Sequence, residues 1–227
     1  MRCDVQYFCR CTIITLFVFF SSNCLGQFNV RVGFNQAFVN ADVLNLFIDD
    51  YNLTNASLLE MEMGNLRSMQ GIGLGIDYKL GSRTFMLHWN NLSKQHSAIG
   101  EFSDGSLLQE ELFYSSNQFL FGVENSFNNI GIGTGFVYNQ WRMKNRIANS
   151  DFKRTLVSDT QWAAHIHLSI NFKSSDRVGF AIVPFIQIPL NEINVGPIHN
   201  ELNGITVDAM DKLTVWGIQF VFINGPQ

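Results

Sequence analysis

Eight short segments of this chain alternate apolar side chains with small or polar ones, and the connections between them are short and long in turn. Residues 71–80 show the pattern most clearly, because isoleucine, leucine and tyrosine occupy the even positions while glycine, aspartate and lysine occupy the odd ones. Successive side chains of a β-strand point to opposite faces. The pattern therefore predicts strands that have one apolar face and one small or polar face.

The predicted fold is an all-β, eight-stranded, antiparallel up-and-down transmembrane β-barrel. Most of the segments have the roughly 9–11 residues that a tilted strand needs to cross a bilayer. Short turns and long loops would leave from opposite rims, as the periplasmic turns and external loops of small outer-membrane barrels do. The predicted strands are 28–36, 70–80, 83–93, 116–126, 129–141, 160–172, 177–188 and 212–223, and the long loops are 37–69, 94–115, 142–159 and 189–211.

The composition indicates which face of the predicted barrel meets lipid. A soluble, lipocalin-like barrel would point its apolar face inward and cover its outside with lysine and glutamate. Only 15% of this chain is charged, and the polar face of the segments is mostly glycine, asparagine, serine and histidine. Small inward residues suit the narrow interior of an eight-stranded barrel. Aromatic residues gather near both ends of the apolar face, which is typical of the two water boundaries of a membrane barrel.

Residues 1–26 are predicted to be an export signal. Two arginines precede an apolar run at 12–20, and small residues lead to a cleavage site before Gln27. Residues 27–227 would then be the barrel domain, exported to the outer membrane of a Gram-negative bacterium. A lipid anchor on Cys24 is the alternative. All four cysteines lie in the predicted signal, so disulfides and thiolate metal sites are not expected in the barrel.

On these features the chain resembles the small eight-stranded outer-membrane proteins of the OmpA/OmpX type. The resemblance covers residues 28–223 and rests on topology and alternation rather than on a motif. One departure concerns the C-terminal end, where such proteins commonly finish on an aromatic residue. Here Phe220 and Phe222 precede a short Ile-Asn-Gly-Pro-Gln tail.

Several ionisable residues are predicted to point into the barrel. Arg31 and Asp77 lie on neighbouring strands at similar depth, which predicts an ion pair, because an unpaired charge in a narrow interior would be very costly. The simplest interpretation is a polar plug that fills the interior. A proton-conducting or ligand-binding lumen and a narrow transport pore are the alternatives. The predicted lumen network comprises Arg31, Asp77, Lys79, His88, Glu124, His165 and His167.

Two patterns in one strand suggest chemistry. His165 and His167 share a face, but two histidines without a third nearby ligand are a weak metal signal, and no metal or other cofactor is expected. The run His167-Leu168-Ser169 is similar to the His-x-Ser element of PagL-type lipid A deacylases, which implies a histidine base beside a serine nucleophile. In that family the pair faces lipid, whereas here both side chains are predicted to face the lumen. A protein without enzymatic activity is therefore the main hypothesis.

The predicted external loops offer a binding surface. The loop 142–159 is cationic, and its side chains could bind lipopolysaccharide phosphates by charge-assisted hydrogen bonds; the alternative is that they form salt bridges with acidic neighbours. Its candidate residues are Arg142, Lys144, Arg146, Lys153 and Arg154.

The first predicted loop has apolar residues at helical spacing over 43–51, which predicts a short helix that caps the barrel mouth. The chain has a net charge of −4, which argues against nucleic acid as a partner. The hypothesis is an envelope-structural, adhesion or complex-accessory barrel that contacts outer-membrane lipid and lipopolysaccharide. A protein partner could bind through its external loops.

Overall fold

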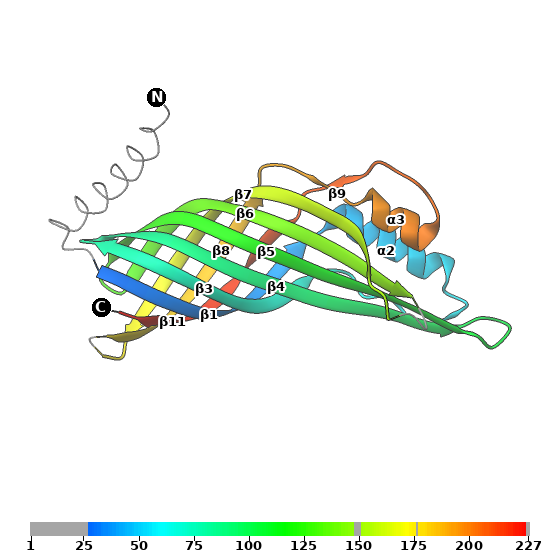
Figure 1. Cartoon of the computed structure of the whole chain (residues 1–227), viewed down its shortest axis with the longest axis horizontal. Helices are drawn as coiled ribbons and strands as arrows, with labels where there is room; N and C mark the ends of the chain where they lie inside the picture. The colour runs from blue at the N-terminus through cyan, green and yellow to red at the C-terminus, as the bar shows by residue number, and fades with distance from the viewer. Residues whose placement is uncertain (1–26, 148–150, 176, 226–227) are drawn as a thin grey trace, which may run out of the picture.

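The computed structural model describes residues 27–147, 151–175 and 177–225, and the predicted signal at 1–26 lies outside the described residues. Eight long strands form a closed antiparallel barrel (Figure 1). The barrel closes because every strand pairs with two neighbours, including β1 with β11 and β4 with β5. The predicted fold class is confirmed. The eight strands are β1 (Gln27–Asn40), β3 (Ser68–Leu80), β4 (Arg83–Glu101), β5 (Leu107–Phe127), β6 (Ile130–Ile147), β7 (Arg154–Lys173), β8 (Val178–Pro189) and β11 (Thr214–Asn224).

Two helices cover the end of the barrel that is opposite to the short turns (Figure 1). The helix predicted at 43–51 is confirmed as α2 (Asp42–Thr54), and α3 (Gly196–Asn203) packs against it. None of the helices among the described residues is both long and apolar enough to cross a membrane. The remaining strands are short: β2 (Leu59–Met61) pairs with the outer end of β4, and β9 (Ile193–Asn194) pairs with β10 (Met210–Asp211).

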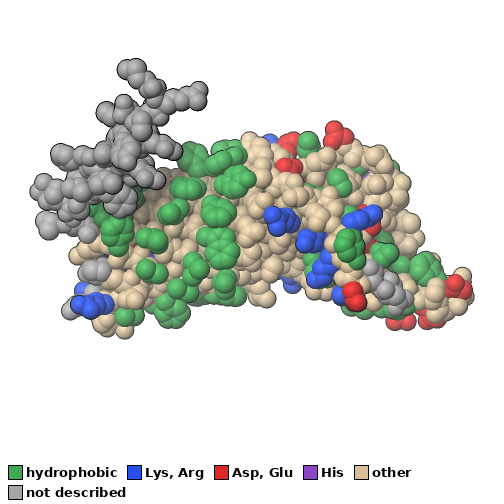
Figure 2. Space-filling view, in the orientation of Figure 1, with side chains coloured by type: hydrophobic (Ala, Val, Ile, Leu, Met, Phe, Trp, Pro, Cys, Tyr) green, Lys and Arg blue, Asp and Glu red, His purple; other side chains and the backbone are tan. Residues whose placement is uncertain are grey.

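The outer wall near the short turns is an apolar belt. Phe28, Ile72 and Phe136 are 68%, 56% and 58% exposed, and they point outward from three different strands. Figure 2 shows hydrophobic side chains gathered over this part of the barrel, whereas most charged side chains lie beyond it. A water-facing sheet would not expose so large an apolar surface. The soluble barrel is therefore excluded, and the belt faces lipid.

Aromatic side chains border the belt on both sides. Near the short turns, the rings of Phe28 and Tyr78 are 4.9 Å apart between centroids. On the other side, Tyr138 and Trp162 are separated by 5.1 Å, and the stacked pair of Phe38 and Trp216 by 4.4 Å. These contacts match the aromatic girdles that flank the lipid-facing band of membrane barrels.

The predicted loops 94–115 and 142–159 are largely strand, so their predicted boundaries are wrong. β4 and β5 stay paired from the barrel wall out to Glu101 and Leu107, and β6 and β7 stay paired almost to their ends. These extensions project beyond the belt as hairpins (Figure 1). Their outward residues meet water, so the apolar residues of the extensions point inward instead.

The main apolar core lies inside the external half of the barrel. Leu44 and Ile48 of α2 pack there with Trp141 and Met143 of β6, and all four side chains are almost fully buried. Burial of each such side chain contributes roughly 1.5–3 kcal/mol. The expectation of a polar interior therefore holds only for the membrane half, because the external half is filled by an apolar plug under the helices.

Candidate functional site

The first polar cluster of the lumen joins β1, β3 and β4. Arg31 forms an ion pair with Asp77, and the other carboxylate oxygen of Asp77 lies 2.8 Å from Nε2 of His88. All three side chains are buried. Gly75 stands between Arg31 and His88 in the strand register, and a Cβ atom there would collide with the His88 ring. The glycine face that the sequence shows thus makes room for this cluster.

The second polar cluster lies across the lumen on β5 and β7. Oε2 of Glu124 is 3.0 Å from Nε2 of His167. The two residues are separated by Gly133 of β6, which pairs with Glu124 on one side and with His167 on the other. The missing side chain of Gly133 leaves space for the imidazole. Ser126 Oγ donates to the Glu124 carboxylate over 3.3 Å, and Ser169 also bonds to this carboxylate.

His165 lies between the second cluster and the apolar plug. Its ring is 5.2 Å from that of His167 and 5.8 Å from that of Phe185, measured between centroids. Apart from Lys79, the residues of the predicted lumen network are therefore all inside the barrel. Lys79 lies at the short-turn rim, where it is half-buried. Among the described residues, no group of three histidine, cysteine or acidic side chains is placed to hold a metal ion.

The lumen opens toward the short-turn end. A cavity of about 130 Å³ lies there, lined by the carboxylates of both clusters and by the turn residues Asn128 and Asn129. A cavity of only about 20 Å³ follows among the histidines. Above it Gln187 donates to Gln118 over 3.1 Å, and Trp141 donates to Gln161 over 3.2 Å. The polar path then ends at the apolar plug.

The structure does not assemble the His-x-Ser pair of lipid A deacylases. His167 and Ser169 both face the lumen and are buried, while Leu168 between them faces lipid. The imidazole of His167 is held by Glu124, and the Ser169 hydroxyl accepts a hydrogen bond from Asn171 over 3.2 Å. Within residues 151–175, no hydrogen bond joins His167 to Ser169. A base cannot activate a serine that it does not contact.

The five predicted cationic residues lie on the outer hairpins, most of them on strands rather than in a loop. Arg142, Lys144 and Arg146 occupy alternate positions of β6 and point outward. Arg146 pairs with Glu111 of β5 at 2.6 Å, and Arg154 of β7 pairs with Glu201 of α3. These two cations therefore form the salt bridges that were the alternative to phosphate binding.

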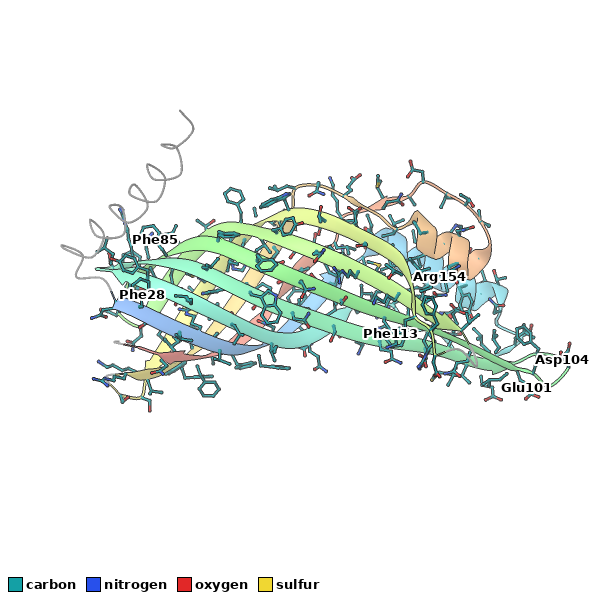
Figure 3. The ribbon with its side chains drawn as sticks, viewed as in Figure 1. Phe28, Phe85, Glu101, Asp104, Phe113 and Arg154 are labelled. Carbon is teal, nitrogen blue, oxygen red and sulfur yellow. The ribbon has the colours of Figure 1, made fainter. Side chains whose placement is uncertain are left out.

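The other three cations form a separate group, for which we use the name outer-wall cations: Arg142, Lys144 and Lys153. Among the described residues, none of the three forms an ion pair with a carboxylate. Lys153 Nζ lies 3.7 Å from the ring centroid of Phe113, which is the cross-strand partner of Lys144. Figure 3 shows Phe113 and Arg154 on the hairpins between the barrel wall and the tip that carries Glu101 and Asp104.

The outer-wall cations begin just outside the aromatic girdle. Arg142 is four residues beyond Tyr138 on β6, which is about 13 Å along an extended strand. Its register neighbours are Ser115 of β5 and Ser158 of β7, and Ser115 Oγ donates to the carbonyl of Arg142 over 3.3 Å. An exposed guanidinium surrounded by hydroxyl groups at this height is suited to bind an anionic lipid headgroup.

A polar cluster that sequence reasoning did not foresee holds α3 on the hairpins. Asn145 of β6 donates to both Glu110 of β5 and Glu201 of α3, and Arg154 pairs with Glu201. Burial raises the pKa of Glu110, although the bond from Asn145 and the charge of Arg154 oppose the shift. No sequence signal identifies this cluster, because its members belong to three hairpin strands and one distant helix.

The sequence matches no protein-family model and no curated protein. Among solved structures, it is similar to Ail of Yersinia pestis in complex with the heparin analogue sucrose octasulfate, with 13% identity, 87% of this chain and 98% of that chain covered, and a TM-score of 0.46. Neisserial surface protein A has 8% identity, coverages of 87% and 96% and a TM-score of 0.44. OprG of Pseudomonas aeruginosa has 13% identity, coverages of 88% and 95% and a TM-score of 0.43.

The closed pairing of eight strands and the apolar outer belt are sufficient to identify the fold without these similarities. The chain has the fold of a small eight-stranded outer-membrane barrel. The apolar belt places the barrel across a lipid layer, with its hairpins and helices on one side and its short turns on the other.

Proposed function

We propose that this protein is a sealed, non-enzymatic barrel that binds lipopolysaccharide phosphates on its outer wall and so contributes to envelope integrity. The observation that carries the proposal is the position of the outer-wall cations. Arg142 and Lys144 point outward from β6 beyond the aromatic girdle, and Lys153 is exposed and lies against the Phe113 ring. None of the three forms an ion pair with a described carboxylate. Phosphate groups of lipid A lie at this level of an outer membrane.

The chemistry of the three side chains supports a phosphate ligand. A guanidinium offers a planar fork of donors to phosphate oxygens, and ammonium groups add charge-assisted hydrogen bonds. Each lysine or arginine near an anionic lipid surface is worth about 1 kcal/mol. The neighbouring hydroxyl of Ser158 can donate to a further phosphate or sugar oxygen.

The plugged interior supports a structural rather than a transport role. A solute that enters from the short-turn end would meet the bonded amides of Gln118 and Gln187 and then the buried ring of Trp141. An eight-stranded barrel has an interior that its own side chains can fill. The external surface is therefore the part of the molecule that can bind a ligand.

The test measures binding of the detergent-solubilised protein to immobilised lipopolysaccharide. Replacing all three outer-wall cations by glutamine should weaken binding on the order of 100-fold, which corresponds to about 3 kcal/mol for three charges. Arg83→Gln is the matched control, because Arg83 is an exposed cation at the short-turn rim. Dephosphorylated lipopolysaccharide should bind the unmodified protein as weakly as the triple variant binds the native glycolipid. Equal binding by the triple variant and the control would contradict the proposal.

A protein partner is a second candidate, and it is favoured by the outer face of α2. Leu46 and Leu53 are 64% and 77% exposed, although they belong to a helix that lies outside the lipid. Such a surface could be covered by another subunit of an envelope complex. Leu46→Ser combined with Leu53→Ser should then release proteins that co-purify with the unmodified chain, while the outer-wall triple variant should retain them.

A further inference from the structure

The hydrogen-bonded ladder between β7 and β8 is interrupted inside the membrane belt. The two strands pair from Ala163–Pro189 to His167–Phe185, and again from Ile170–Ile182 to Lys173–Gly179. The register leaves out the two pairs between these stretches, Leu168 with Pro184 and Ser169 with Val183. On the other side of β7, Leu168 and Ser169 pair with β6 without a break.

Pro184 explains the interruption. A proline has no backbone N–H group and is normally absent from the interior of a sheet. The ladder between β8 and β11 continues past the pair of Pro184 and Ile218, so the missing N–H group must be the one directed toward β7. Its acceptor would be the carbonyl of Leu168. One hydrogen bond is thus missing, and both pairs leave the register because each of them depends on that bond.

The consequence is large in this position because lipid supplies no substitute donor. In a bilayer, every backbone group must be satisfied within the protein, and an open sheet edge is not tolerated. Each of the other strand pairs of the described barrel runs through the belt without a gap. The seam of β7 and β8 at Pro184 is therefore the weakest line in this wall.

The weak point separates lipid from the second polar cluster. On the outside, Leu168 and Ile186 are each 38% exposed and face the acyl chains. On the inside, Ser169 is fully buried and bonds to the carboxylate of Glu124. A small separation of the two strands would bring a polar, hydrogen-bonding group into contact with the hydrocarbon layer.

We propose that β7 and β8 separate locally at Pro184 and form a lateral route between the acyl layer and the lumen cluster of Glu124, His167 and Ser169. The route would admit a lipid-soluble molecule whose polar end, such as a hydroxyl group, can bond to the Glu124 carboxylate. The polar path of the lumen ends at the apolar plug toward the hairpins, and the short-turn cavity meets water, so this seam is the route that would lead to the cluster directly from the acyl layer.

Hydrogen–deuterium exchange of the protein in nanodiscs tests whether the seam opens. Pro184→Ala supplies the missing N–H group and should slow exchange in residues 166–172 about tenfold, the effect of one restored backbone hydrogen bond. Pro189→Ala is the matched control, because Pro189 lies on the same strand at its outer end. The control should leave exchange in the belt unchanged. Unchanged exchange in the Pro184→Ala variant would overturn the proposal.

Cysteine labelling tests whether the opening reaches Ser169. All four native cysteines lie in residues 1–26, so the unmodified protein gives the background for a Ser169→Cys variant. A lipid-soluble maleimide should label Cys at this position, and the added Pro184→Ala change should slow the labelling about tenfold, as the restored bond requires. Labelling by a charged, water-soluble maleimide alone would indicate access through the short-turn cavity and would refute the lateral route. Resistance of each variant to unfolding on unheated gels shows that the barrel has assembled.

Discussion

The membrane half and the external half of this barrel use the same strands with opposite chemistry. On β6, Phe136 points outward to lipid and Asn139 points inward, whereas farther along Arg142 points outward to water and Trp141 points inward. The same face of the strand points outward on both sides of the membrane boundary. What changes is the medium outside, so the apolar residues move from the outer face to the inner one.

The comparison shows that each half is stabilised by a different means. The external half has a conventional apolar core, closed by α2 and α3. The membrane half instead holds hydrogen-bonded and ionic clusters over glycines, because lipid removes the need to hide apolar residues inside. Buried charges are tolerated there only because each has a partner.

The largest loss of stability should come from truncating a side chain in the external core. Trp141→Ala removes a fully buried indole that also donates to Gln161, and it should destabilise the barrel by about 3–5 kcal/mol. Urea unfolding of the reconstituted protein, followed by fluorescence of the remaining tryptophans, measures the change. Phe136→Ala is the matched truncation in the membrane half. It should cost much less, because lipid fills the space that the ring leaves. Equal losses in the two variants would break the comparison.

A smaller effect should come from placing a charge on the outer wall. Phe136→Arg puts a guanidinium into the apolar belt and should cost up to about 2–4 kcal/mol, the range for a charge at the bilayer midplane. The same new residue at Gln140, which points outward beyond the girdle, should change stability by no more than about 0.5 kcal/mol. The folded fraction on unheated gels across a urea series reports both. A tolerant Phe136 site would mean that the belt is not in lipid.

The strands of the membrane half were predictable because their side chains alternate between apolar residues that face lipid and small or polar residues that face the lumen. The segment 70–80 was predicted as a strand and lies within β3. The extensions were missed because the apolar residues change face at the boundary, so one strand resembles two segments separated by a loop. Leu112 and Tyr114 point inward beyond that boundary, whereas Phe119 and Phe121 point outward within the belt.

Contacts within the site were predictable only where they join two neighbouring strands. Arg31 and Asp77 lie on adjacent strands, and their similar depth was enough to suggest the ion pair that the structure contains. The bond between Glu124 and His167 spans a third strand, and it depends on the glycine between them. The pair of Arg154 and Glu201 depends on the position of α3, which no strand register determines. Pro184 was a readable signal that was missed, because a proline within the predicted strand 177–188 marks a ladder break.

The smallest effect that would sharpen the comparison is a pH dependence confined to the external half. Asp211 is a buried carboxylate that accepts a hydrogen bond of 2.9 Å from the backbone N–H of Leu44, near the start of α2. Burial raises its pKa above the ordinary value of 3.8. A raised carboxyl pKa means that the folded state binds the proton more tightly than the unfolded state. Protonation therefore adds stability, which is complete below the unfolded pKa and is lost as the pH rises through the folded pKa.

Asp211→Asn should remove this dependence while keeping an acceptor for Leu44. Between pH 4 and pH 7, the native chain should lose slightly more stability with rising pH than the variant does, as measured by urea unfolding at each pH. Asp104→Asn is the control, because Asp104 is an exposed carboxylate at the hairpin tip and hydrogen bonds from Ser106 lower its pKa. Its removal should change the pH profile in the opposite direction or not at all. Identical profiles for the native chain and Asp211→Asn would show that the plug under the helices is hydrated, and the contrast between the two halves would then be weaker than the burial of Asp211 indicates.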